Sequence, residues 1–171
     1  MRFGDFLKAT VLLSAGCATL LATVTVLGIS RESDRVLIYV TAGWWLAATA
    51  IGTALGRRAE TSPPIAGLLA GARTQTSLPE QMPGTTIINR LWPLLLATIG
   101  AAVVAFVEPQ VASVAAGFTI IWALAWRRQE RAVLAIEERD GVRFYVERTS
   151  PFSPIRLIRT PGFGGSYLPT I

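Results

Sequence analysis

The sequence contains no histidine and only one cysteine, Cys17. A single cysteine cannot form a disulfide bond within the chain, and zinc, haem and iron–sulfur sites depend on histidine or cysteine ligands. Ser-His-Asp and Cys-His catalysis also need a histidine. The Gly-rich run at 162–165 lacks the Lys-Ser or Lys-Thr pair of a phosphate loop. We therefore expect a protein that is not an enzyme and that uses no cofactor and no metal.

Charged residues are scarce as well: they make up 16% of the 171 residues, whereas 51% are hydrophobic. The apolar residues fall in four long runs, and a membrane span needs roughly 20 of them. We expect an integral membrane protein, mainly α-helical, with four transmembrane helices within residues 1–131. The expected spans are about 6–29, 36–56, 91–107 and 111–126, with a cytoplasmic loop at 57–90.

Only three residues, Glu108 to Gln110, separate the last two apolar runs. Pro109 cannot donate the hydrogen bond of a helix interior, so we expect a tight helical hairpin that turns at a membrane surface. The alternative is one long buried helix, which would place Glu108 in hydrocarbon.

The basic residues are unevenly distributed. If the N-terminus lies in the cytoplasm, the cytoplasmic segments hold 14 of the 16 Lys and Arg residues, and the outer loops hold Arg31 and Arg35. This excess follows the positive-inside bias and predicts a multi-pass protein of the bacterial cytoplasmic membrane with both termini in the cytoplasm. Arginines at the span ends are expected to contact headgroups of an anionic inner leaflet. These candidate contacts are Arg57, Arg58, Arg127, Arg128 and Arg131.

The stretch Leu12 to Cys17, LLSAGC, resembles a bacterial lipoprotein signal, although Ser14 stands where that pattern has leucine. The chain stays apolar after Cys17, whereas a mature lipoprotein usually turns polar. We therefore expect a buried thiol in a membrane helix, with lipidation of Cys17 as the alternative.

Two ladders of small residues lie within the expected spans. Small residues let helix backbones approach closely, which is how helices pack in lipid, so we expect a compact bundle. The ladders are Ala48, Gly52 and Gly56, and Ala97, Ala101 and Ala105.

Trp44 and Trp45 fall near the middle of the second span, away from the interfaces that tryptophan usually occupies. They could pack against small residues of neighbouring helices, or they could form an intramembrane contact with a lipid, a pigment or a partner helix. No charged residue lies near the middle of any span, which argues against an ion-coupled transporter or a proton pump.

Residues 132–171 are expected to form a cytoplasmic unit. Asp140-Gly141 is typical of a two-residue hairpin turn, which would pair residues 135–138 with residues 143–146. The alternative continues a helix from the fourth span to Arg139, with the glycine as its C-cap. We favour the hairpin, because the second segment is rich in β-forming residues and needs a partner strand.

The remainder of this unit predicts one more strand and a Pro/Gly-rich tail. The run Ile155 to Arg159 would add a third strand, because a lone hairpin is marginally stable in water. Apolar side chains here are candidates for docking a protein partner: Phe144, Tyr145, Phe152, Ile155, Leu157 and Phe163.

Together these features predict a non-enzymatic accessory, assembly or scaffold subunit that docks a protein partner through its C-terminal segment. A lipid-handling or small-molecule permease component is the alternative. Nucleic acid is not an expected partner, because acids are interspersed among the basic residues of the tail. Glu137 and Glu138 lie beside arginines, and we expect both carboxylates on the solvated surface.

Overall fold

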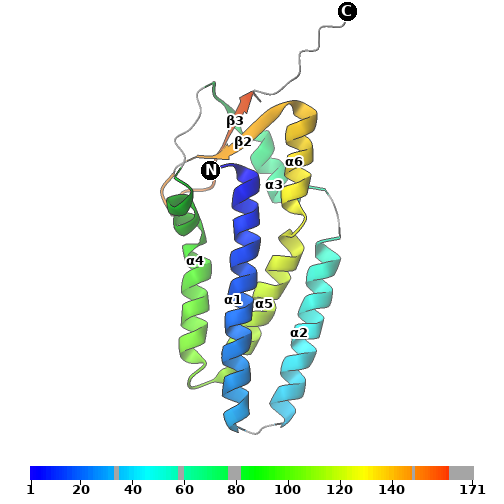
Figure 1. The fold of residues 1–171 in the computed structure, drawn as a ribbon, viewed down its shortest axis with the longest axis vertical. Helices are drawn as coiled ribbons and strands as arrows, with labels where there is room; N and C mark the ends of the chain where they lie inside the picture. Colours follow the sequence, from blue (N-terminus) through cyan, green and yellow to red (C-terminus); the bar gives the residue numbers. More distant parts are fainter. Residues whose placement is uncertain (33–34, 58–59, 77–81, 148, 162–171) are drawn as a thin grey trace, which may run out of the picture.

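Four long helices form a bundle that carries a small cap at one end (Figure 1). The computed structural model describes residues 1–32, 35–57, 60–76, 82–147 and 149–161. The long helices are α1 (Phe3–Glu32), α2 (Arg35–Leu55), α4 (Pro83–Val104) and α5 (Pro109–Trp126). Helix α5 packs against the other three, α1 also packs against α4, and α2 lies at the side of the bundle (Figure 1).

The four expected spans correspond to four helices that are long and apolar enough to cross a membrane. Their boundaries differ from the expected ones: α1 has 30 residues, about 45 Å at 1.5 Å per residue, which exceeds a hydrocarbon core of about 30 Å. Helix α4 begins at Pro83 rather than near 91. The chain turns after Val104 and α5 starts at Pro109, so the helical hairpin is confirmed and the single long helix is wrong.

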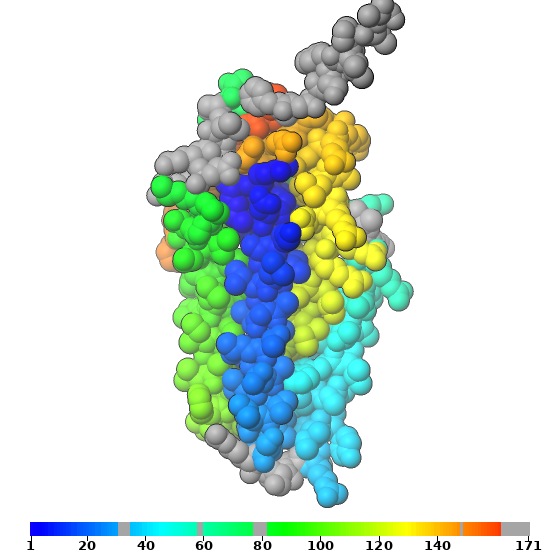
Figure 2. Space-filling view, in the orientation of Figure 1, coloured from blue at the N-terminus to red at the C-terminus, as the bar shows by residue number. Residues whose placement is uncertain are grey.

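Small and hydroxyl side chains fill the inside of the bundle, while large apolar side chains face outward. Figure 2 shows the helices as closely packed columns on the side that is drawn. Buried hydroxyls donate to a carbonyl four residues earlier, as Ser14 does to Thr10 at 2.8 Å. Fully buried positions include Ser14, Thr25, Ala48, Ala112 and Ala116, and exposed ones include Leu12, Leu46, Leu96, Val103 and Phe118. This distribution suits a lipid environment, because water-soluble proteins rarely expose so much contiguous apolar surface.

Helix α2 approaches α5 closely along the first ladder of small residues. Ala48 and Gly52 are buried, and a Cβ on Gly52 would lie 3.0 Å from the Cα of Ile121. A Cβ on Gly56 would overlap the carbonyl oxygen of Leu124. This ladder therefore packs as expected for a compact bundle.

The second ladder of small residues is buried at one end and exposed at the other. Ala105 is buried in a small cluster with Leu21 of α1, and Ala101 packs against that cluster. Ala97 is exposed at the bundle surface. Only part of this ladder therefore serves helix packing within the chain.

The cap is built from the start of α1, two short helices and a three-stranded sheet. The short helices are α3 (Pro63–Ala70) and α6 (Gln129–Asp140), and the strands are β1 (Arg73–Thr74), β2 (Val142–Val146) and β3 (Leu157–Pro161). The strand order is β1-β3-β2, with β2 antiparallel and β1 parallel to β3. The N-terminus and all three strands lie at this one end of the bundle (Figure 1).

The predicted hairpin at Asp140-Gly141 is wrong, and the helical alternative is right about the C-cap at Gly141. The helix does not continue from the fourth span, however, because α5 ends at Trp126 and α6 begins at Gln129. Residues 129–140 form α6, and Gly141 ends this helix with a φ of 62° while its N–H donates to the carbonyl of Glu137. The helix prevails because it buries one face, with Gln129, Val133 and Glu137 spaced four residues apart along it. Glycine then provides the left-handed backbone of a helix C-cap at little steric cost.

The partner of β2 is the segment that was expected to be the third strand. Tyr145 lies opposite Ile158, and Val146 lies opposite Leu157. The true third strand, β1, comes from the expected loop at 57–90, which also contains α3. A sheet of three strands is therefore present, but the central loop contributes one of them.

We predict that Gly117→Ala destabilises the bundle. The added Cβ would overlap the indole of Trp44, which packs on α5 at this point, and overpacking of this kind typically costs about 1–3 kcal/mol. Thermal unfolding of the full-length protein in mild detergent, followed by circular dichroism, would measure the change. Gly100→Ala is the matched control, because a Cβ there meets no heavy atom within 4 Å. Equal melting temperatures for the two variants would contradict the packing described.

Candidate interaction site in the cap

The core of the cap brings distant parts of the chain together. Phe3 and Leu7, in the first turns of α1, are almost completely buried against the sheet and the neighbouring helices. These turns therefore belong to the cap, and the remaining length of α1 is available to cross a bilayer. The buried core consists of Met1, Phe3, Phe6, Leu7, Ile65, Leu91, Val133, Val142, Phe144, Val146 and Leu157.

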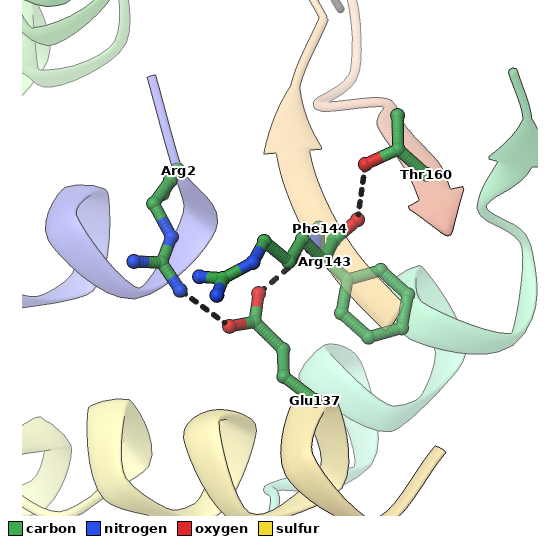
Figure 3. A network of polar contacts seen from close by, with 5 residues as sticks. All are labelled: Arg2, Glu137, Arg143, Phe144 and Thr160. Atoms are coloured by element: carbon green, nitrogen blue, oxygen red, sulfur yellow. Dashed lines mark hydrogen bonds and ion pairs between the residues drawn. The ribbon is translucent and has the colours of Figure 1, made fainter. Parts of the chain in front are cut away.

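A buried carboxylate joins three elements of the cap (Figure 3). The side chain of Glu137, on α6, is 5% exposed, and its Oε2 accepts a hydrogen bond from the guanidinium of Arg2 at 3.1 Å. Its Oε1 accepts a hydrogen bond from the backbone N–H of Phe144, on β2, at 2.8 Å. Hydrogen bonds to both oxygens offset the cost of removing this charge from water. The expectation that Glu137 is solvated is therefore wrong, whereas Glu138 is exposed.

The same carboxylate helps to cover an edge of the sheet. One edge of β2 pairs with β3. On its other edge, the N–H of Phe144 meets Glu137, and the N–H of Val146 donates to the carbonyl of Met1 at 3.0 Å. Arg2 also forms an isolated antiparallel bridge with Tyr145. An uncovered strand edge can pair with another chain, so the N-terminal residues and Glu137 protect this edge.

Gln129 fixes the junction between α5 and α6 to the segment before α3. Its side chain is buried, and its Oε1 accepts a hydrogen bond from the N–H of Ser62 at 3.0 Å. Its Nε2 donates to the carbonyl of Glu60 at 3.4 Å. Sequence reasoning missed both Gln129 and Glu137, because their shared face appears only when 129–140 is taken as a helix.

The loop between β2 and β3 is fastened to α4. The guanidinium of Arg90 donates to the carbonyl of Ser153 and to the hydroxyl of Thr149. Trp92 meets Phe152 edge-on, with ring centroids 5.7 Å apart. Phe152 is nevertheless 85% exposed. The loop therefore holds a large aromatic side chain at the surface of the cap.

The six candidate docking residues separate into distinct groups. Phe144, Tyr145 and Leu157 are buried, so their side chains support the cap from inside and offer no docking surface in this structure. Ile155 is partly buried against the same core. Phe163 lies outside the described residues. Phe152 is the exposed member of the set.

The arginines expected at the headgroups gather near the cap end of α2 and α5. Arg57, Arg127, Arg128 and Arg131 are exposed, and Arg58 lies outside the described residues. Arg128 donates to the carbonyl of Arg57 at 2.8 Å, which ties the two helix ends together. Contact of these side chains with lipid remains a prediction.

Trp44 and Trp45 connect α2 to α5. Their indole N–H groups donate to the carbonyls of Val114 and Ser113 at 3.3 Å and 3.0 Å. The hydroxyl of Ser113 also donates to that of Thr41 at 3.1 Å. Both indoles thus make contacts within the chain, which favours the packing interpretation over a contact with an external pigment or lipid.

Cys17 is buried within the continuous helix α1. Lipoprotein processing would remove the residues before this cysteine, and with them Phe3, Phe6 and Leu7 of the cap core. The buried-thiol interpretation therefore agrees better with the fold, and lipidation stays an untested alternative.

The described residues contain no group of three His, Cys, Asp or Glu side chains that could hold a metal ion. No family model, curated protein or solved structure matches this chain.

We predict that Glu137→Ala loosens the cap. Arg2 and the N–H of Phe144 would lose their acceptor, and an unmet buried hydrogen bond costs roughly 1–3 kcal/mol. Limited proteolysis should cut residues 132–161 faster than in the unaltered protein. Glu138→Ala is the matched control, since that neighbouring side chain is exposed. Equal cleavage rates in both variants would show that the Glu137 carboxylate is not needed to stabilise the cap.

Proposed function

We propose that this chain is a multi-pass protein of the bacterial cytoplasmic membrane that acts as a non-enzymatic accessory, assembly or scaffold subunit. The bundle anchors the cap, and the cap docks a protein partner. The observation that carries this proposal is Phe152, an aromatic side chain that is 85% exposed on a loop fastened by Arg90. Exposed aromatic anchors on pre-organised segments contribute strongly to protein interfaces, because little freedom is lost on binding.

The proposed orientation places the cap in the cytoplasm. The N-terminus, the start of α4 and the whole cap share one end of the bundle (Figure 1), and this end includes the exposed Arg57, Arg127 and Arg128. Arg35, at the start of α2, lies at the other end. Positive residues are retained on the cytoplasmic side, so their excess at the cap end supports this orientation.

We predict opposite accessibility for cysteines placed at Phe106 and Phe152. These residues are 81% and 85% exposed, and they lie near opposite ends of the bundle. In a Cys17→Ser background, a membrane-impermeant maleimide should label Phe106→Cys in intact cells and label Phe152→Cys only after permeabilisation. The reverse pattern would place the cap outside the cytoplasm.

We also predict that Phe152→Ala removes a partner. Loss of an interface anchor costs about 2 kcal/mol or more, enough to deplete a co-purifying protein severalfold. Full-length variants would be purified after mild cross-linking in native membranes and compared by quantitative mass spectrometry. Phe106→Ala is the matched control, since this residue is equally exposed but lies far from the cap. Identical sets of co-purifying proteins in both variants would refute docking through this loop.

A further inference from the structure

A groove lies between α4 and α5 in the apolar part of the bundle. Its empty volume is about 650 Å³, including the side that opens to the surroundings. Leu94 and Ala97 of α4 line the groove together with Ala115, Phe118 and Trp122 of α5, and Leu21 of α1 also contributes. The groove thus lies between helices that have the length and composition of membrane spans.

A second, more open hollow lies along α5 toward the end of the bundle away from the cap. It is lined by α5 alone, at Gln110, Val111 and Val114, and it shares Ala115 and Phe118 with the first hollow, the groove between α4 and α5. From Gln110 to Trp122 the helix rises about 18 Å at 1.5 Å per residue. This length is a little more than half the thickness of a hydrocarbon core of about 30 Å.

The lining favours an aliphatic occupant. Two hydroxyl side chains reach the first hollow, and both already donate within their own helix: Thr98 to Leu94 and Thr119 to Ala116, each at 2.8 Å. Neither hydroxyl hydrogen is therefore free to bond to a polar solute, whereas an aliphatic chain needs only van der Waals contact.

The cap end of the groove has the features of a membrane interface. Trp122 lines the groove and stacks on Trp126, with ring centroids 5.2 Å apart. Tryptophan is enriched at the level of lipid headgroups, and Trp126 is the last residue of α5. An occupant that enters from the bilayer would therefore place its polar end near this stack.

We infer that the groove binds one acyl chain of a bilayer phospholipid, with the headgroup near Trp122 and Trp126. The walls of the groove contact an acyl chain on several sides. The chain therefore gains more dispersion energy in the groove than on the outer face of a single helix. The inference goes beyond the scaffold role. It rests on the proposed membrane insertion and is independent of partner docking.

The test uses the full-length protein in phosphatidylcholine vesicles that contain a small fraction of phosphatidylcholine with a diazirine in one acyl chain. Flotation of the vesicles first establishes insertion. After illumination, peptide mapping should find labels enriched on residues 94–98 and 115–122 relative to the outer face of α2. Ala97→Phe, which fills the groove from an exposed wall position, should reduce this enrichment to the level of the α2 face. Ala47→Phe, at an exposed position of α2, should leave it unchanged.

Each other outcome contradicts a defined part of the inference. Insertion with uniform labelling in the unaltered protein would overturn the lipid site and leave the scaffold proposal standing. Weaker labelling of residues 94–98 and 115–122 than of the outer face of α2 would overturn the lipid site, because it would show that protein covers the groove. Failure to float would overturn both the lipid site and the proposed membrane insertion.

Discussion

The carboxylate of Glu137 joins the N-terminal residues of the chain to α6 and β2. By accepting hydrogen bonds from Arg2 and from the N–H of Phe144, it holds the start of α1 and strand β2 against α6. The edge of β2 is then covered, and the apolar side chains of Phe3 and Leu7 are buried under the sheet. Removing either partner would leave a buried charge or a buried donor unpaired, which is why this contact matters more than an exposed ion pair.

The bundle and the cap form one connected structure. Helix α1 runs without interruption from the cap core to the far end of the bundle, and α5 leads directly into the junction that Gln129 holds. Within the bundle, α2 and α5 approach closely at Gly52 and Gly117. In lipid, such close packing and interhelical hydrogen bonds replace the hydrophobic effect as the source of helix association. A docking surface on the cap would therefore be held in a defined position relative to the bundle.

This architecture suits anchoring and presentation. The fastened loop presents Phe152 to the surroundings, while most other apolar side chains of the cap form its core. The groove between α4 and α5 presents a separate surface, with an aliphatic rather than a polar lining. Partner docking and lipid binding would thus use separate surfaces at different levels of the same structure.

Much of the fold could be predicted from local sequence. Long apolar runs indicated four helices, and Pro109 indicated the turn between α4 and α5, because both signals depend on neighbouring residues. The ladder Ala48, Gly52 and Gly56 likewise indicated a packing face. Asp140-Gly141 was ambiguous, because the same glycine serves a hairpin turn or a helix C-cap.

Contacts between distant segments decided the rest. Pairing of β2 with β3 and the burial of one face of α6 resolved the ambiguity at Gly141, and β1 came from a loop without a clear strand signal. Glu137 and Glu138 have similar neighbours in sequence, yet Glu137 is buried, because the helix turns it toward Arg2. Thus the sequence by itself determined the apolar helices, the scarcity of catalytic groups and the excess of arginine at one end. Only the tertiary structure decided which polar groups are buried and which of the candidate docking side chains stays exposed, since burial depends on partners far apart in the chain.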